Sequence, residues 1–163
     1  MTIRAATEAD IAAIQRIARA SWAADYPNIL SRETAESGVD EWYSTDGLDS
    51  ELSHPRSIIA VAEESGDVVG FVHAITGEEV GHVLRLYVDP DHRRRGIGHR
   101  LLEHAVEEMA DLDHDRVAAL VLAENDLGVD FYRSAGFETV DEAETMIGGT
   151  AYRELAMERP ITR

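Results

Sequence analysis

The stretch RLYVDPDHRRRGIGHRLL, residues 85–102, joins two patterns of different period through a turn rich in arginine and glycine. The apolar run that ends at Val88 is typical of a β-strand, which Pro90 then stops. From residue 96 onward the apolar residues recur on one face of a helix, namely Ile97, Leu101, Leu102, Ala105, Val106 and Met109. The stretch therefore predicts a strand over 82–89, a glycine turn and a helix over 96–110.

The glycine turn has the composition of an anion site. Gly96 and Gly98 let the backbone come close to a ligand, while the first N–H groups of the helix have no partner inside it. Four arginines surround the turn: Arg93, Arg94, Arg95 and Arg100. Arginine at a helix N-terminus opposes the helix dipole, whereas a bound phosphate suits both the dipole and the guanidinium groups. A bound phosphate is therefore favoured over a coincidental basic helix start.

Two common phosphate motifs do not fit the turn. A dinucleotide fingerprint needs a third glycine, where this sequence has Leu101. A P-loop needs a lysine before Ser or Thr, and the chain contains no lysine. The sequence therefore argues against nicotinamide binding and against nucleotide hydrolysis.

The charge balance excludes another class of partner. Asp and Glu number 32 against 15 basic residues, all arginine, and the formal net charge is -17. Binding to nucleic acid needs a broad basic face, so no nucleic acid partner is expected. At molar salt the Debye length is about 3 Å, which screens repulsion among so many carboxylates. We therefore hypothesise a halophilic source, with an ordinary acidic protein kept soluble by its charge as the alternative.

Cysteine is absent, which excludes disulfides, thiolate metal sites and cysteine nucleophiles. The seven histidines show no metal-binding spacing, so no metal is expected. No run approaches the roughly 18 apolar residues of a membrane span, and the N-terminus is charged at once. These features predict a soluble, cytoplasmic protein with no membrane partner.

The order of patterns along the chain predicts an α/β protein with one domain over residues 1–163 and a three-layer core. Helices are expected over 7–22, 32–43, 96–110 and 126–135, and strands over 57–64, 68–76, 82–89, 116–123, 137–147 and 150–159. Because a crossover helix connects strand 82–89 to strand 116–123, these two strands should be parallel in a mixed sheet.

Two motifs resemble those of one enzyme family. Residues 93–98, Arg-Arg-Arg-Gly-Ile-Gly, fit the Gln/Arg-x-x-Gly-x-Gly/Ala signature of the GNAT superfamily of acyl-CoA-dependent N-acetyltransferases. Residues 124–137, ENDLGVDFYRSAGF, are similar to the family's Asn...Phe-Tyr-x-x-x-Gly-Phe segment. The resemblance covers about residues 2–159. It implies a GNAT-like three-layer fold, in which a mixed central sheet of about six to seven strands carries helices on both faces and splays between the two central parallel strands.

The resemblance also implies acetyl-CoA as co-substrate. The strand backbone that would pair with the pantetheine arm belongs to Leu86, Tyr87 and Val88. The turn and helix start that would hold the pyrophosphate comprise Arg93, Arg94, Arg95, Gly96, Ile97, Gly98 and His99. Asn125 matches a position whose side chain often bonds the cofactor arm, and capping of the following helix is its alternative role.

The chemistry implied is direct transfer of the acetyl group to an amine, with Tyr132 as general acid to the CoA thiolate. A phenol with a pKa near 10 stays protonated at neutral pH and can still donate to a thiolate. The competing role is a packed aromatic ring, but Leu127, Phe131 and Ala135 are predicted to form the core stripe of this helix without it. Transfer of a longer acyl group, or a non-catalytic acyl-CoA-binding regulatory module, remain alternatives.

The general base and the acceptor are less defined. Similar sequences often carry an acid where this chain has His82, so His82, or Glu79 acting through water, is a candidate base, with a surface histidine as the alternative. Trp22 and Tyr26 are expected either to line the acceptor cleft or to pack between helices. A cationic acceptor would suit an acidic chain, but net charge is a weak argument at high salt. A homodimer is possible.

Overall fold

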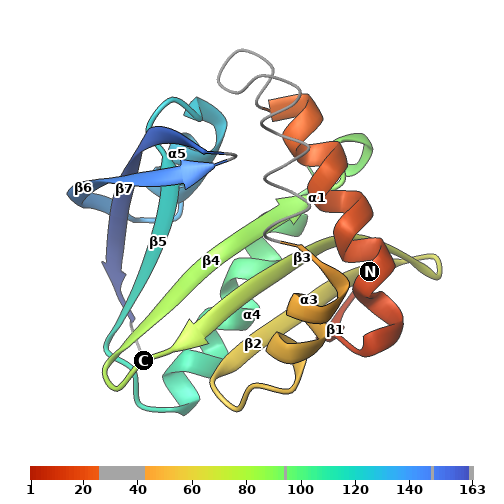
Figure 1. Cartoon of the computed structure of the whole chain (residues 1–163). Helices are drawn as coiled ribbons and strands as arrows, with labels where there is room; N and C mark the ends of the chain where they lie inside the picture. The colour runs from red at the N-terminus through yellow and green to blue at the C-terminus, as the bar shows by residue number, and fades with distance from the viewer. Residues whose placement is uncertain (26–42, 94, 148, 162–163) are drawn as a thin grey trace.

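The computed structural model describes residues 1–25, 43–93, 95–147 and 149–161, and it places seven strands in one sheet in the order β1-β2-β3-β4-β5-β7-β6 (Figure 1). The strands are β1 (Thr2–Ala5), β2 (Ser57–Glu64), β3 (Asp67–Thr76), β4 (Val80–Val88), β5 (Arg116–Leu122), β6 (Glu138–Ile147) and β7 (Thr150–Pro160). The helices are α1 (Ile11–Asp25), α3 (Thr45–Leu52), α4 (Ile97–Asp111) and α5 (Asp126–Ser134), with 3-10 turns η1 (Glu8–Asp10) and η2 (Pro90–His92).

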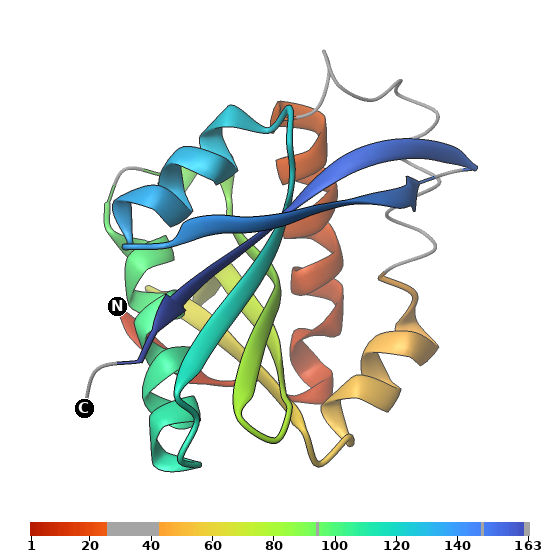
Figure 2. The ribbon, with the colours of Figure 1, turned by 90° about the vertical axis from the view of Figure 1, so that its left-hand side faces the viewer.

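Helices cover both faces of the sheet, which confirms the predicted three layers (Figure 2). On one face α4 buries its whole apolar stripe, Ile97, Leu101, Leu102, Ala105, Val106 and Met109, against the sheet. On the other face α1 buries Ile14, Ile17 and Trp22 together with Tyr43 and Phe71. The two separate clusters follow from strand alternation, which sends successive side chains to opposite faces.

The parallel pair β4–β5 separates part-way along its length. Strand pairing covers only Val80–Val83 with Arg116–Ala119, after which the two strands diverge, as Figure 1 shows. On its other side β4 continues to pair with β3, but the register shifts between His73 and Ala74, which leaves Leu84 as an extra residue. Such a bulge bends and twists its strand. The splay expected from the resemblance is therefore present, and it begins at the bulge.

Two elements were missed by the sequence prediction. Strand β1 has only four residues and no clear alternation of buried and exposed positions, yet it pairs with β2 at the edge of the sheet. Helix α3 buries only Leu48, so it has no apolar stripe to detect, although Ser44 caps its start by accepting from Gly47 N–H. The helix predicted over 32–43 lies outside the described residues, apart from its last position.

The N-terminal segment is fixed to the sheet by one arginine. Arg4 donates to both carboxylate oxygens of Asp10, at 2.8 and 2.9 Å, and to Glu63 at 2.8 Å. Asp10 also accepts from the Thr7 backbone N–H at 2.8 Å and is buried. The side-chain bonds to Arg4 hold the pKa of Asp10 below its usual range, so this carboxylate stays ionised in the fold.

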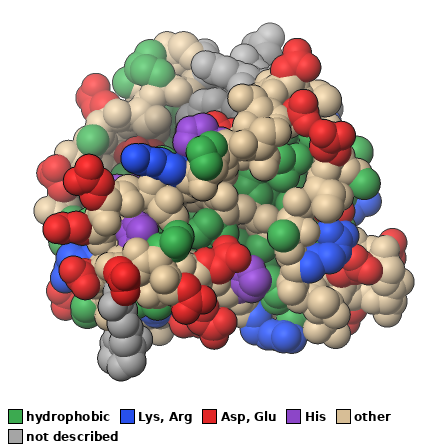
Figure 3. Space-filling view, turned by 90° about the horizontal axis from the view of Figure 1, so that it is seen from below, with side chains coloured by type: hydrophobic (Ala, Val, Ile, Leu, Met, Phe, Trp, Pro, Cys, Tyr) green, Lys and Arg blue, Asp and Glu red, His purple; other side chains and the backbone are tan. Residues whose placement is uncertain are grey.

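Many of the other carboxylates among the described residues are dispersed over the surface, as Figure 3 shows for one face. Several pair with arginines: Arg95 with Glu64, Arg116 with Glu158, and Arg159 with Glu103. Within the described ranges, no helix combines the length and the apolar character needed to cross a membrane.

Candidate active site

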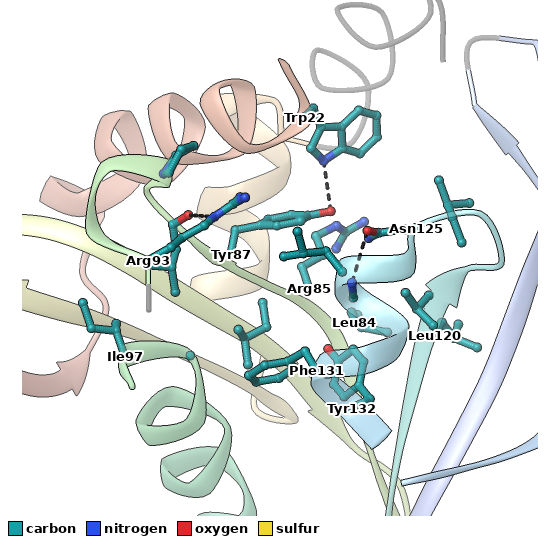
Figure 4. Close-up of a pocket in the computed structure, with 18 of the residues that line it drawn as sticks. Trp22, Leu84, Arg85, Tyr87, Arg93, Ile97, Leu120, Asn125, Phe131 and Tyr132 are labelled. Carbon is teal, nitrogen blue, oxygen red and sulfur yellow. Dashed lines mark hydrogen bonds between the residues drawn. The ribbon is translucent and has the colours of Figure 1, made fainter. Parts of the chain in front are cut away.

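A pocket of about 700 Å³ occupies the gap between the diverging ends of β4 and β5 (Figure 4). Strand β4 contributes residues 84–88, β5 contributes residues 120–122, and the starts of α4 and α5 close the pocket. Its volume is in the usual range for ligand sites. Because β4 has lost its β5 partner here, backbone groups on this edge are open to a ligand that adds in the manner of a strand.

The glycine turn forms one end of the pocket, where Gly96, Ile97, Gly98 and His99 are all lining residues. Gly96 precedes α4 with a φ of +78°, a conformation that favours glycine. A Cβ on Gly98 would lie 3.1 Å from the Phe131 ring, so glycine allows α4 to approach α5. The first N–H groups of α4 have no intrahelical partner and are suited to hold a phosphate.

The arginines of the turn have different positions. Arg93 lines the pocket, and its Nε donates to the Val88 carbonyl at 3.3 Å (Figure 4). Arg95 is not among the lining residues and contacts Glu64 at 3.5 Å on the outside. Arg94 lies outside the described residues. Of the two arginines that the structure describes here, Arg93 therefore lies at the pocket and Arg95 outside it.

Tyr132 lies on α5 and is 6% exposed. Its ring packs against Phe131 and Phe137, each with centroids 5.2 Å away, and it lines the pocket. Burial, and secondly the nearby Tyr87, raise the pKa of the Tyr132 phenol above its ordinary value, so it remains a proton donor. The predicted core stripe was wrong at Leu127, which is 63% exposed at the pocket. Phe131 and Ala135 do pack against the core, but α5 buries Val129 and Tyr132 more deeply, so Tyr132 belongs to the packed side of the helix.

Asn125 has both of the features weighed from the sequence. Its Oδ1 accepts from the Gly128 backbone N–H at 3.2 Å, which caps α5, and the side chain also lines the pocket (Figure 4). Since the cap uses only the oxygen, the amide N–H groups can donate to a ligand.

The aromatic side chains near α1 form one connected group. The Trp22 indole donates to the Tyr87 hydroxyl at 2.9 Å, as Figure 4 shows, and Trp22 both lines the pocket and is 2% exposed. Tyr87 in turn contacts Phe71 and Tyr43. Packing and pocket lining are thus combined in Trp22. Tyr26, the other predicted acceptor residue, lies outside the described residues.

His82 and Glu79, the predicted bases, are not among the pocket-lining residues. His82 pairs with Ala118 in the part of β4 that is still hydrogen-bonded to β5. Glu79 is exposed in the turn before β4, and its carbonyl accepts from Asp115 N–H. Both residues precede the point at which β4 and β5 diverge, so neither side chain lies at the pocket.

Comparison with known proteins decides the family. The model of the acetyltransferase (GNAT) family matches residues 13–137, which is most of the chain and includes the glycine turn and α5. The chain belongs to the GNAT family of acetyltransferases.

One curated relative and two solved structures illustrate the likeness. The spermidine N(1)-acetyltransferase of Thermoplasma acidophilum is 29% identical over 143 residues, covering 85% of this chain and 89% of the relative. The crystal structure of the PaiA N-acetyltransferase from Thermoplasma acidophilum, in complex with coenzyme A, has a TM-score of 0.86 at 28% identity and covers 98% of both chains. The Escherichia coli ribosomal-protein-S18-alanine N-acetyltransferase shares the fold, with a TM-score of 0.75 at 20% identity over 99% of this chain and 94% of that one.

Two charged residues of this GNAT pocket were missed by the sequence analysis. Glu154 of β7 lines the pocket, and burial raises the pKa of its carboxyl. Arg85 of β4 also lines it, with its guanidinium 5.1 Å from the centre of the Tyr43 ring and Nη1 3.3 Å from His73 Nδ1. Arg85 begins the stretch 85–102 but received no role there, and Glu154 belongs to no motif; both reach the pocket through the geometry of their strands. Among the described residues, no group of three or more Asp, Glu and His side chains is placed to hold a metal.

Buried His73 lies behind the pocket-lining Arg85. It is 3% exposed, and its Nε2 is 3.4 Å from a carboxylate oxygen of Glu51. Burial, and secondly the positive charge of Arg85, lower the pKa of His73 to about 4. The ring is therefore neutral at neutral pH, so its Nδ1 can accept from Arg85.

Proposed function

We propose that this GNAT acetyltransferase transfers the acetyl group of acetyl-CoA directly to a primary amine, with Tyr132 as general acid and residues 1–163 as a single catalytic domain. The observation that carries the proposal is the shared pocket, which brings together the splayed β4 edge, the glycine turn and the Tyr132 ring. These three parts lie on different elements and serve different portions of one extended substrate.

The cofactor positions follow the pocket. The pyrophosphate would be held by the backbone N–H groups of residues 96–99 and by the Arg93 guanidinium, because these groups carry positive charge or partial charge at one end of the pocket. The pantetheine arm would lie along Leu86, Tyr87 and Val88, where β4 has no β5 partner. Asn125 would donate to the arm from the opposite wall.

The transfer step needs no covalent enzyme intermediate. The amine nitrogen attacks the thioester carbonyl carbon, a C–N bond forms, and the C–S bond breaks. A free backbone N–H of the splayed β4 would polarise the carbonyl, and the Tyr132 hydroxyl would give its proton to the departing thiolate. Tyr132 then regains a proton from the amine nitrogen of the product.

The first acceptor to test is a polyamine. The Thermoplasma relative, named a spermidine N(1)-acetyltransferase, matches over 89% of its own length, which supports an extended amine as acceptor for this chain as well. A non-catalytic acyl-CoA-binding module is less well supported, because the GNAT acetyltransferase model and an acetyltransferase relative both match most of the chain.

The experiment is release of free CoA thiol from acetyl-CoA with spermidine, lysine and an alanine-initiated peptide, each at several KCl concentrations. Acetylation of at least one amine is expected. Binding of CoA without thiol release for any amine would refute the catalytic proposal. A parallel series with butyryl-CoA tests the alternative of a longer acyl group.

We also propose that the protein functions at high salt. The supporting features are the 32 carboxylates against 15 arginines and their dispersal over the surface (Figure 3). Charge repulsion of this size is screened at molar salt. Unfolding followed by circular dichroism should show a higher midpoint in 2 M KCl than in dilute buffer, and full stability in dilute buffer would contradict the idea.

A further inference from the structure

Glu154 is the sole carboxylate among the described residues that line the pocket. The chain has 32 Asp and Glu residues, and Glu154 differs from the other described ones in lining the pocket. Its position therefore suggests a role toward a ligand. Glu154 is half-buried on β7, next to the apolar Leu122 of β5. A carboxylate in such a place costs free energy unless it has a polar or cationic partner.

The strand register places Glu154 on the side of the pocket that faces α1. Leu122 is its direct partner on β5, and paired residues of antiparallel strands project to the same face. Leu122 packs with Trp22 and Ile147 in the core cluster on the α1 side. The glycine turn begins α4 on the opposite side, and Figure 2 shows β5 and β7 between α4 and α1. Glu154 is thus separated from the proposed pyrophosphate site by the sheet.

Among the described residues, the Glu154 carboxylate has no partner that would explain its position. Among the residues described in the structure, no hydrogen bond or ion pair involves the Glu154 side chain, whereas Glu158 on the same strand pairs with Arg116. Burial raises the pKa of Glu154, as expected for a carboxylate without a nearby cation. A cationic ligand would supply the missing partner.

We propose that Glu154 binds the ammonium group of the acceptor and takes its proton, which makes the acceptor class a cationic primary amine. This inference rests on the proposed amine transfer. The ammonium gives one proton to the Glu154 carboxylate, and the neutral amine then forms the C–N bond. The second proton lost by the nitrogen replaces the one that Tyr132 gives to the CoA thiolate, so the products are the amide, CoA thiol and one proton for solvent.

Glu154 meets two requirements that the predicted bases do not. It lines the pocket, whereas Glu79 and His82 do not. A base also becomes more effective as its pKa approaches the pKa of the group that it deprotonates. Because burial raises the pKa of the Glu154 carboxyl, it lies closer to the pKa of a primary amine, which is near 10.

The test compares Glu154→Gln with a matched control, Glu158→Gln. Both remove one negative charge from the same face of β7, but Glu158 does not line the pocket. Calorimetry would measure CoA binding to each variant and spermidine binding to its CoA complex, and thiol release would give kcat/KM for spermidine. We expect Glu154→Gln to weaken spermidine binding at least tenfold and to lower kcat/KM for spermidine at least 100-fold. The affinity for CoA should stay within twofold of wild type.

The controls separate the possible failures. Glu158→Gln should match wild type, and Glu154→Asp should recover part of the activity because it restores the charge. Wild-type protein that acetylates spermidine while Glu154→Gln stays within threefold of it would overturn the role of Glu154 and leave the proposed function standing. Wild-type protein that releases no thiol with any amine would overturn the transferase proposal together with this one.

Discussion

Replacing Tyr132 by Phe should separate chemistry from folding in this protein. The ring is 6% exposed and packs between Phe131 and Phe137, contacts that Phe retains. Within the described residues the hydroxyl makes no hydrogen bond, so its loss leaves no buried partner unsatisfied. We therefore expect the free energy of unfolding to change by less than about 1 kcal/mol.

Catalysis should respond quite differently. A positioned general acid typically contributes about 100- to 10,000-fold, which corresponds to about 3–5 kcal/mol of transition-state stabilisation. Because proton donation to the thiolate occurs only in the transition state, kcat and kcat/KM should fall together while KM and CoA affinity stay near wild type.

The assay is thiol release from acetyl-CoA with an accepted amine, alongside urea denaturation and CoA calorimetry on the same preparations. Tyr152→Phe serves as the control, since Tyr152 is a half-buried tyrosine of β7 that does not line the pocket. Turnover of Tyr132→Phe within threefold of wild type would refute the general-acid role. A loss of turnover accompanied by an equal loss of CoA binding would instead assign Tyr132 to cofactor binding.

Three further predictions concern the cofactor site and the stability of the fold. Gly98→Val should weaken CoA binding at least tenfold in calorimetry. The valine Cβ alone would lie 3.1 Å from the Phe131 ring, and the valine side chain would cover the start of α4. Unchanged CoA affinity would exclude the proposed phosphate site. Asp10→Ala should lower the free energy of unfolding in urea by about 2 kcal/mol, since Arg4 loses two hydrogen bonds and the Thr7 N–H loses one; a change below about 0.5 kcal/mol would show that water replaces the carboxylate. His73 has a pKa of about 4 in the fold against about 6.5 when unfolded, so the unfolded state binds the proton first and stability should fall as the pH drops from about 6.5 to about 4. His73→Gln should flatten urea-measured stability in that window, and an unchanged slope would contradict the assignment.

Local sequence patterns predicted most of the fold. The apolar runs of β2 to β4, the helical stripe from Ile97 to Met109 and the crossover between β4 and β5 can all be read from short stretches of sequence, and the structure has each of them. The two missed elements, β1 and α3, bury too few residues to produce such a pattern. The glycine turn was also detectable, because two closely spaced glycines occur where a strand pattern gives way to a helical one. Gly96 has a positive φ there, and Gly98 allows the close approach of Phe131.

The charged residues of the pocket were decided only by tertiary structure. Acidic residues occur throughout β6 and β7, so nothing in the local sequence distinguishes Glu154 from Glu144 or Glu158. The pairing of Leu122 with Glu154 places this carboxylate toward α1, and the separation of β4 from β5 beyond Val83 opens the pocket that it lines.

The sequence by itself determined the family motifs, the order of the larger elements and the glycine turn, since these depend on residues close together in the chain. Only the tertiary structure decided where β4 and β5 separate, which side chains of α5 are buried, and which carboxylate lines the pocket. The physical reason is that the pairing of β5 with β7 and the short pairing of β4 with β5 arise from contacts between segments distant in sequence.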